Sequence, residues 1–393
     1  MCAGTAIFKH REFRAYTFIA LGVFLVAGTS VRGDWLSLQQ RIVDIFAENK
    51  NAIVRVKAAY GSGVEDGLPQ VVIGTGFFIS KSGLILTNSS IAYDPLRVWI
   101  EHQGVSYAAE IVGADRSANL ALLQLATIPK DFSFLHLVDS ADLPKVGELV
   151  VRLSMPLDFD VSPKFGMITG FESRFGGSFF PCKYIRTSID GAPGEGGAAY
   201  LDLSGRLVGM QVGGLPEVES TYVLPARAAL RIRDDLLNAG EVEYGWIGFE
   251  VREESTVAEG HRLILAEVMG STPAAAAGLR AGDILDKIGE YPVRSVDDLR
   301  NAMFYTRVGQ YVVVTVIRGS GTKDFSVRLE KRPDNEPLTV LRTISRSIEA
   351  AISPMEDRMP ADAEPLESPL LPKSRMAPEP STRGDIPMET PRK

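Results

Sequence analysis

Residues 74–90, GTGFFISKSGLILTNSS, decide the fold of the larger part of the chain. Two short apolar runs flank a Ser-Lys-Ser-Gly turn in this stretch, which is the pattern of a β-hairpin. Such runs alternate with Gly, Asp and Ser turns from Ile53 to Pro225, for example in RVWIEHQG (97–104) and GELVVRLS (147–154). The pattern predicts a mostly β region, folded as an antiparallel sandwich or barrel.

Helical spacing first becomes clear in residues 226–239, ARAALRIRDDLLNA, which are followed by Gly240. A glycine directly after the last apolar position is a typical helix end. The helix therefore predicts a domain boundary, with one domain over residues 34–240 and a smaller α+β domain over residues 244–332.

The composition is that of a globular protein of two or three domains. The chain has 393 residues, of which 45% are hydrophobic and 23% charged, and these values exclude a wholly disordered chain and a multi-span membrane protein. The net charge is −7, so nucleic acid is not an expected partner, because proteins that bind it usually carry a basic excess. The two cysteines, Cys2 and Cys182, are too few for a disulfide framework or a metal cluster, and Cys182 is expected to be buried.

The two ends of the chain differ from its middle. Residues 1–33 combine a basic region with 17 uncharged residues from Ala15 to Val31. They predict a cleaved signal peptide or a retained N-terminal membrane anchor, and in both cases an exported, periplasmic or extracytoplasmic protein. Residues 333–393 hold 11 of the 23 prolines and predict a disordered tail.

Three blocks of sequence resemble the HtrA/Deg family of serine proteases. The first is residues 74–90, where the family has GSGF-I…GYILTNxHV. The second is residues 115–123 (DRSANLALL), against the family's D-x-x-x-D-L-A-x-L. The third is residues 187–209, which follow A-I-N-P-G-N-S-G-G-P-L-x-N-x-x-G-x-V-I-G. The resemblance covers residues ~40–240 and implies a trypsin-like double β-barrel.

The chain departs from this family at all three positions of the catalytic triad. Ser90 stands where the resemblance places the histidine, Asn119 where it places the aspartate, and Gly196 where it places the nucleophilic serine. Glycine has no side chain to attack a carbonyl, and an alcohol is not appreciably basic at neutral pH. The catalytic residues are therefore expected to be absent, with Ser90, Asn119 and Gly196 as the degenerate positions.

Three histidines remain outside the N-terminal segment. His102 follows an apolar run and precedes a Gln-Gly turn, so we expect a solvated turn residue. His136 is expected to be half-buried, and His261 belongs to the second domain. None stands at a spacing that predicts a substitute base for hydrolysis.

The glycine-rich loop of the third block keeps its shape-determining residues. Gly194, Glu195 and Gly196 form a remnant of the oxyanion loop, whose backbone N–H groups would gather around a carbonyl or carboxylate. The negative charge of Glu195 is expected to oppose an oxyanion there. A tight turn retained only for folding is the alternative.

Residues 244–332 resemble a PDZ domain of the HtrA type. The stretch YGWIGF (244–249) is similar to the family's carboxylate-binding loop, and GSTPAAAAGLRAGDIL (270–285) to its G-S-P-A-x-x-A-G-L-x-x-G-D-x-I. A helix is expected after Ser295, an N-cap residue, with Asp298 at the capping-box position.

The resemblance implies peptide binding by β-strand addition. Backbone N–H groups of Ile247, Gly248 and Phe249 would hold a terminal carboxylate. Leu299 and Met303, one helical turn apart, would either line an apolar pocket for the last side chain or pack in the core.

These features leave three hypotheses for the function. The first is a catalytically inactive HtrA-like pseudoprotease that binds unfolded or C-terminal peptides and acts as a scaffold, chaperone or regulator of an active paralogue. The others are an active endopeptidase that uses non-standard residues, and a structural envelope tether. The resemblance also implies a homotrimer or a mixed oligomer, with the aromatic residues Trp35 and Phe46 available for the contact. No cofactor or metal is indicated.

Overall fold

The computed structural model describes residues 35–61, 69–140, 143–175, 178–215, 219–256 and 260–331. The expected targeting segment and the proline-rich tail both lie outside the described residues. Within the described ranges, no helix is long and apolar enough to cross a membrane.

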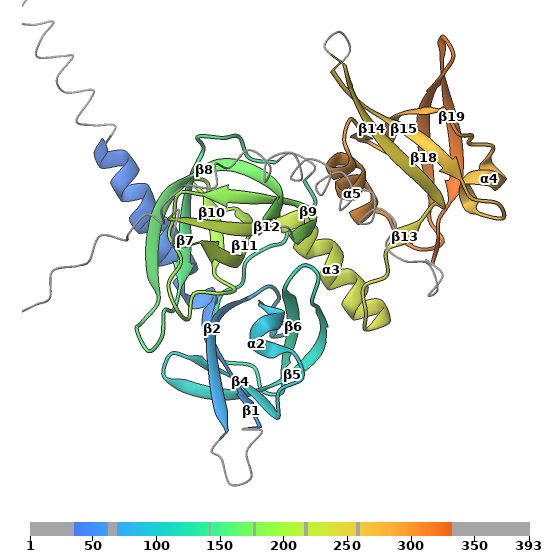
Figure 1. Ribbon diagram of the computed structural model, residues 1–393. Helices are drawn as coiled ribbons and strands as arrows, with labels where there is room; N and C mark the ends of the chain where they lie inside the picture. The colour runs from blue at the N-terminus through green and yellow to red at the C-terminus, as the bar shows by residue number, and fades with distance from the viewer. Residues whose placement is uncertain are drawn as a thin grey trace, which may run out of the picture. The chain divides into compact units, whose positions relative to one another are not determined.

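The first domain contains two closed six-stranded antiparallel barrels (Figure 1). A helix over residues 35–49 and the short helix η1 (Lys50–Ala52) lead into the first barrel. Its strand order is β1-β2-β3-β6-β5-β4. Its elements are β1 (Ile53–Tyr60), β2 (Gln70–Phe78), β3 (Leu84–Thr87), α2 (Ser89–Ala92), β4 (Arg97–His102), β5 (Val105–Asp115) and β6 (Leu120–Leu125).

The second barrel has the strand order β10-β11-β12-β9-β8-β7. Its strands are β7 (Leu149–Ser154), β8 (Ser162–Phe175), β9 (Ser178–Thr187), β10 (Ala199–Asp202), β11 (Leu207–Leu215) and β12 (Ser220–Pro225). The predicted mostly β class is confirmed, and of the two forms expected from the sequence the barrel is the one observed.

Burial alternates along β4 in the first barrel. In β4 the side chains of Val98, Ile100 and His102 point inward, while those of the intervening residues are more exposed. Burying one valine or isoleucine contributes about 1.5–3 kcal/mol. The same alternation corrects the expectation for His102, which is 3% exposed rather than solvated.

The predicted helix after the second barrel is confirmed as α3 (Ala226–Ala239). It ends at Gly240, whose φ of 76° is left-handed and whose N–H donates to the Leu236 carbonyl. A glycine adopts this conformation without a steric penalty, which explains the helix end.

The smaller domain follows α3 and has its own apolar core. Strands β14-β15-β16-β18-β19 form its main sheet, β17 pairs with β16, and β13 pairs with β20. The elements are β13 (Gly245–Trp246), β14 (Phe249–Thr256), β15 (Gly260–Val268), α4 (Pro273–Ala277), β16 (Ile284–Ile288), β17 (Tyr291–Pro292), α5 (Val296–Phe304), β18 (Tyr311–Arg318), β19 (Gly321–Arg328) and β20 (Glu330–Lys331).

Candidate functional site

The structure joins two of the three degenerate triad positions by a hydrogen bond. The side-chain oxygen of Asn119 accepts from the backbone N–H of Ser90 at 2.9 Å and from the hydroxyl of Ser89 at 3.1 Å. The Asn119 side-chain nitrogen donates to the carbonyl of Val212 in the second barrel, at 2.8 Å. Asn119 therefore ties the segment around Ser90 to both barrels.

Gly196 lies against the same segment. A Cβ atom on Gly196 would lie 2.9 Å from the side-chain nitrogen of Asn88 and 3.8 Å from the nearest atom of Ile91. Asn88 directly precedes α2 and is 4% exposed. The three degenerate triad positions thus lie together around residues 88–91. Ser90 supplies an alcohol there, Asn119 an amide, and Gly196 no side chain.

The oxyanion-loop remnant is clamped by one threonine of β2. The N–H of Thr75 donates to the Gly196 carbonyl at 2.8 Å, and its hydroxyl donates to the Gly194 carbonyl at 2.8 Å. Gly194 has a φ of 83°, and a Cβ there would lie 2.4 Å from the Leu157 backbone nitrogen. Glycine is required at this position for both reasons.

Residues 155–161, between β7 and β8, are pinned beside this loop. The Arg55 guanidinium donates to the carbonyls of Leu157 at 2.6 Å and Phe159 at 2.7 Å, and it pairs with Glu101 at 3.0 Å. Charged donors make strong hydrogen bonds, so Arg55 fixes the backbone on which Gly194 rests.

Glu195 is buried and does not present its charge to solvent, which corrects the sequence-based expectation. Its side chain is 1% exposed, and one carboxylate oxygen accepts from the Arg152 guanidinium at 2.5 Å. The other accepts from the backbone N–H of Ala192 at 2.7 Å. The Ser154 hydroxyl donates to the first oxygen at 3.2 Å. The carboxylate is therefore turned inward, where it is neutralised and holds the loop closed.

Sequence reasoning missed Arg152, although a signal was present. Arg152 interrupts the apolar run LVVRLS and is fully buried in β7. A charge inside a buried strand requires a partner of opposite charge, because an unpaired buried ion is very unfavourable. Besides Glu195, its guanidinium donates to the Asp190 carbonyl at 2.6 Å and to the Gln211 side chain at 3.2 Å.

The histidines lie elsewhere in the fold. His102 is hydrogen-bonded to the Asn51 carbonyl at 3.0 Å, and burial lowers its pKa. His136 is exposed rather than half-buried and packs edge-on against Phe134. His261 lies on β15, 3.5 Å from Glu253. Within the described ranges, no group of three or more His, Cys, Asp or Glu side chains is arranged to hold a metal ion.

The expected carboxylate-binding loop is a turn that leads into β14. Gly248 has a φ of 88°, and a Cβ there would lie 2.4 Å from the Cβ of Thr272. The carbonyls of this turn point into the domain. The Gly248 carbonyl accepts from the Met269 N–H and from the Thr272 hydroxyl. The Ile247 carbonyl accepts from the Ala274 N–H. Phe249 begins β14, which is an edge strand of the main sheet.

Of the two α5 residues expected near this loop, Leu299 is 7% exposed and belongs to the apolar core of the domain. Met303 is partly buried and packs against the same core. Leu299 thus packs in the core of the domain, while Met303 retains exposed surface.

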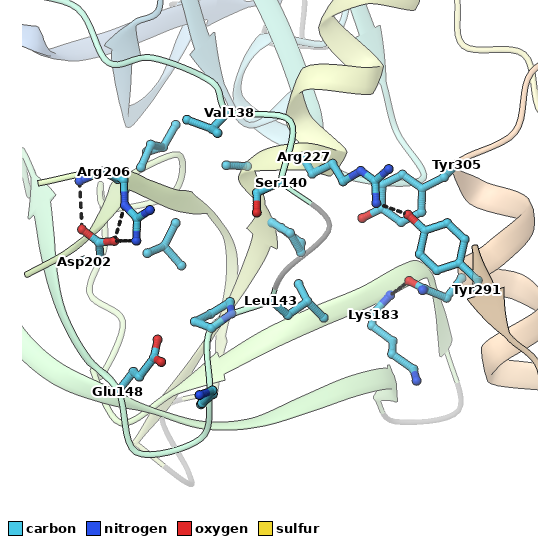
Figure 2. A pocket seen from close by; sticks show the side chains of 17 residues that line it. Val138, Ser140, Leu143, Glu148, Lys183, Asp202, Arg206, Arg227, Tyr291 and Tyr305 are labelled. Carbon is cyan, nitrogen blue, oxygen red and sulfur yellow. Dashed lines mark hydrogen bonds and ion pairs between the residues drawn. The ribbon is translucent and has the colours of Figure 1, made fainter. Parts of the chain in front are cut away.

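Figure 2 shows a pocket of about 560 Å³, whose lining includes neither the degenerate triad positions nor residues 247–249. It is lined by the second barrel, by the start of α3, by residues of the smaller domain and, before the second barrel, by Val138, Ser140, Leu143, Pro144, Lys145 and Glu148. The Arg227 guanidinium donates to Tyr291 and Glu290 at its edge, and the Lys183 backbone N–H donates to the Asn301 side chain at 2.9 Å. None of the degenerate triad positions lines it.

Comparisons with known proteins agree with this architecture. The trypsin-like peptidase domain model matches residues 74–210, and the PDZ domain model matches residues 245–329. Two curated relatives are each named a probable periplasmic serine endoprotease, DegP-like. The one from Hahella chejuensis is 27% identical over 67% of this chain and 58% of its own length, and the one from Pseudomonas fulva is 28% identical over 67% and 57%. The chain thus spans less than two thirds of the length of these relatives.

Solved structures share the fold. The HtrA-type protease AlgW with a tripeptide has a TM-score of 0.58 at 21% identity, over 75% of this chain and 98% of that one. The serine endoprotease from Yersinia pestis has a TM-score of 0.52 at 21% identity, over 74% and 98%.

Proposed function

This chain is a homologue of the HtrA/Deg serine proteases, with a trypsin-like peptidase domain followed by a PDZ domain, and from that premise we propose that it is a non-catalytic member of the group. It binds the C-termini of unfolded or truncated proteins outside the cytoplasmic membrane and does not cleave them. The curated relatives are named as periplasmic, which supports the proposed location.

The absence of a nucleophile and a base at the converging triad positions carries this proposal. Hydrolysis of a peptide bond needs a nucleophile and a group that accepts its proton. Gly196 provides no side chain, Ser90 is exposed and not basic, and the Asn119 oxygen is already occupied by two donors. The barrel then serves as a scaffold, chaperone surface or regulatory partner of an active paralogue.

The loop over residues 190–197 supports retention without cleavage. The N–H groups of Gly194 and Gly196 have no hydrogen-bond acceptor within the described residues. Backbone N–H groups without an internal acceptor are available to a ligand's carbonyl oxygen. A peptide bound at Gly194 and Gly196 would be held there without being attacked.

The turn of Ile247, Gly248 and Phe249 supports binding of a C-terminus. Its carbonyls are consumed inside the domain, which leaves N–H groups for a carboxylate, and the free edge of β14 offers a row of backbone groups to an added strand. The half-buried Met303 on α5 is proposed to contact the last side chain.

Calorimetric titration tests this function. A peptide ending in leucine with a free carboxylate is expected to bind the full chain, while the same peptide with an amidated end is expected to bind much more weakly. Equal affinity for the two peptides, or no heat with either, would contradict the proposal.

We also propose self-association through the helix over residues 35–49. Trp35 is 70% exposed there, whereas Phe46 packs partly against the barrel core and is less available. Sedimentation that shows only monomer at micromolar concentration would rule out this association.

A further inference from the structure

The outward face of the β14–β15 hairpin carries an unusual pair of charges. The register places Glu250 of β14 directly opposite Glu267 of β15. Like charges directly opposite each other destabilise a sheet. Neither side chain belongs to the apolar core, because Glu267 is exposed and Glu250 is half-buried. Core packing therefore gives no reason for two acidic residues at these positions.

The nearby cations are engaged elsewhere. Arg252 pairs with Glu254 at 2.8 Å, and Arg262 pairs with the same carboxylate at 3.0 Å. Within the described ranges no lysine, arginine or histidine forms an ion pair with Glu250 or Glu267. Two negative charges thus lie together at the start of the edge strand, next to the turn at Gly248.

The geometry of strand addition determines which ligand residue meets this pair. A ligand whose carboxylate lies at the turn of Gly248 and whose chain runs antiparallel to β14 places its last residue opposite Phe249. Its penultimate residue then lies opposite Glu250. Successive side chains of a strand point to opposite faces. The last side chain therefore shares the inward face of Phe249, and the penultimate one shares the outward face of Glu250.

We infer that Glu250 and Glu267 select C-termini whose penultimate residue is lysine or arginine. The inference rests on the proposed peptide binding and specifies its ligand class. Neighbouring strands lie about 4.8 Å apart, so Glu250 is one strand spacing from the ligand and Glu267 is two. A lysine or arginine side chain lying across β14 reaches the first carboxylate and approaches the second, and it relieves their repulsion.

The size of the preference follows from the exposure of the pair. An exposed ion pair is weak and changes an affinity by about 1.4- to 5-fold. A penultimate lysine is therefore expected to bind about threefold more tightly than glutamine, and about tenfold more tightly than glutamate, whose charge is repelled. The difference should shrink as salt is added, because the Debye length falls from ~30 Å at 0.01 M to ~3 Å at 1 M.

Titration of three peptides into the full chain tests the inference. All three end in leucine, and they differ only in the penultimate residue, which is lysine, glutamine or glutamate. The double variant Glu250→Lys/Glu267→Lys is expected to reverse the order. Glu253→Lys is the matched control, because it makes the same kind of charge change on the same hairpin but at the register position of the opposite face. It is expected to leave the order unchanged.

The outcomes separate this inference from the function on which it rests. Equal affinities for the three peptides would overturn the selection by Glu250 and Glu267 while leaving peptide binding in place. A preference that survives the double variant would overturn it as well. If no peptide binds, the proposed function fails and the inference fails with it.

Discussion

Replacing Arg152 by methionine tests whether a buried ion pair holds the oxyanion-loop remnant closed. Methionine has a similar length and fills much of the space, so the change removes mainly the charge and its hydrogen bonds. Arg152 is fully buried and Glu195 is 1% exposed. Removing one partner of such a pair leaves an uncompensated buried charge, and we expect a loss of about 3–5 kcal/mol in the free energy of unfolding.

A double-mutant cycle isolates the interaction between the two side chains. Glu195→Gln retains an oxygen that can accept from the Ala192 N–H, but it carries no charge. The double variant is expected to lose less free energy of unfolding than the two single variants lose together. The expected coupling energy is about 2 kcal/mol, within the range measured for residues in one network.

Urea unfolding followed by circular dichroism measures these differences. Arg206→Met is the matched control in the same barrel, because Arg206 is 75% exposed and pairs with Asp202 at 2.9 Å. Exposed pairs contribute at most about 1 kcal/mol. The reasoning would be refuted if Arg152→Met lost less than about 1 kcal/mol in the free energy of unfolding. It would also be refuted if the losses of the two single variants added up to that of the double variant.

Three further predictions concern the carboxylate loop and pH. Gly248→Ala should abolish binding of C-terminal peptides and lower stability by roughly 1–3 kcal/mol, measured by titration and urea unfolding, because its Cβ would collide with Thr272 in a left-handed conformation. Burial lowers the pKa of His102, so its contribution to stability is complete above its ordinary pKa of ~6.5 and is lost as pH falls below it. A profile of melting temperature against pH that is the same in His102→Gln would contradict this. Burial alone would raise the pKa of Asp283, but its hydrogen bonds with Arg318 hold it below the ordinary value. The smaller domain should therefore lose stability as pH falls below ~3.9, and an acid limb equally steep in Asp283→Asn would refute that.

Local patterns in the sequence were sufficient for much of the fold. The helix over residues 226–239 and its end at Gly240 were predicted from apolar spacing and one glycine, and both are confirmed. Ser295 caps α5 as predicted, since its hydroxyl accepts from the Asp298 N–H at 3.1 Å. The reciprocal contact differs from a capping box, because Asp298 accepts from the Arg294 N–H.

The side-chain environments that were predicted wrongly depend on partners far along the chain. The charge of Glu195 is neutralised by Arg152, 43 residues earlier, and no local pattern links the two. His102 is buried because β4 alternates strictly up to its last residue, whereas the adjacent turn suggested exposure. The family resemblance placed Ser90 and Asn119 at triad positions, and only the structure shows the hydrogen bond between them.

The most direct test of the proposed function is incubation of the purified full chain with an unfolded protein, read by mass spectrometry. The chain should be prepared from a protease-deficient host, with Ser90→Ala as a parallel sample. We predict that the unfolded protein stays intact in both samples while peptides with free C-termini bind. Cleavage by the wild-type chain that is lost in Ser90→Ala would contradict the account, because it would show that this site hydrolyses peptide bonds.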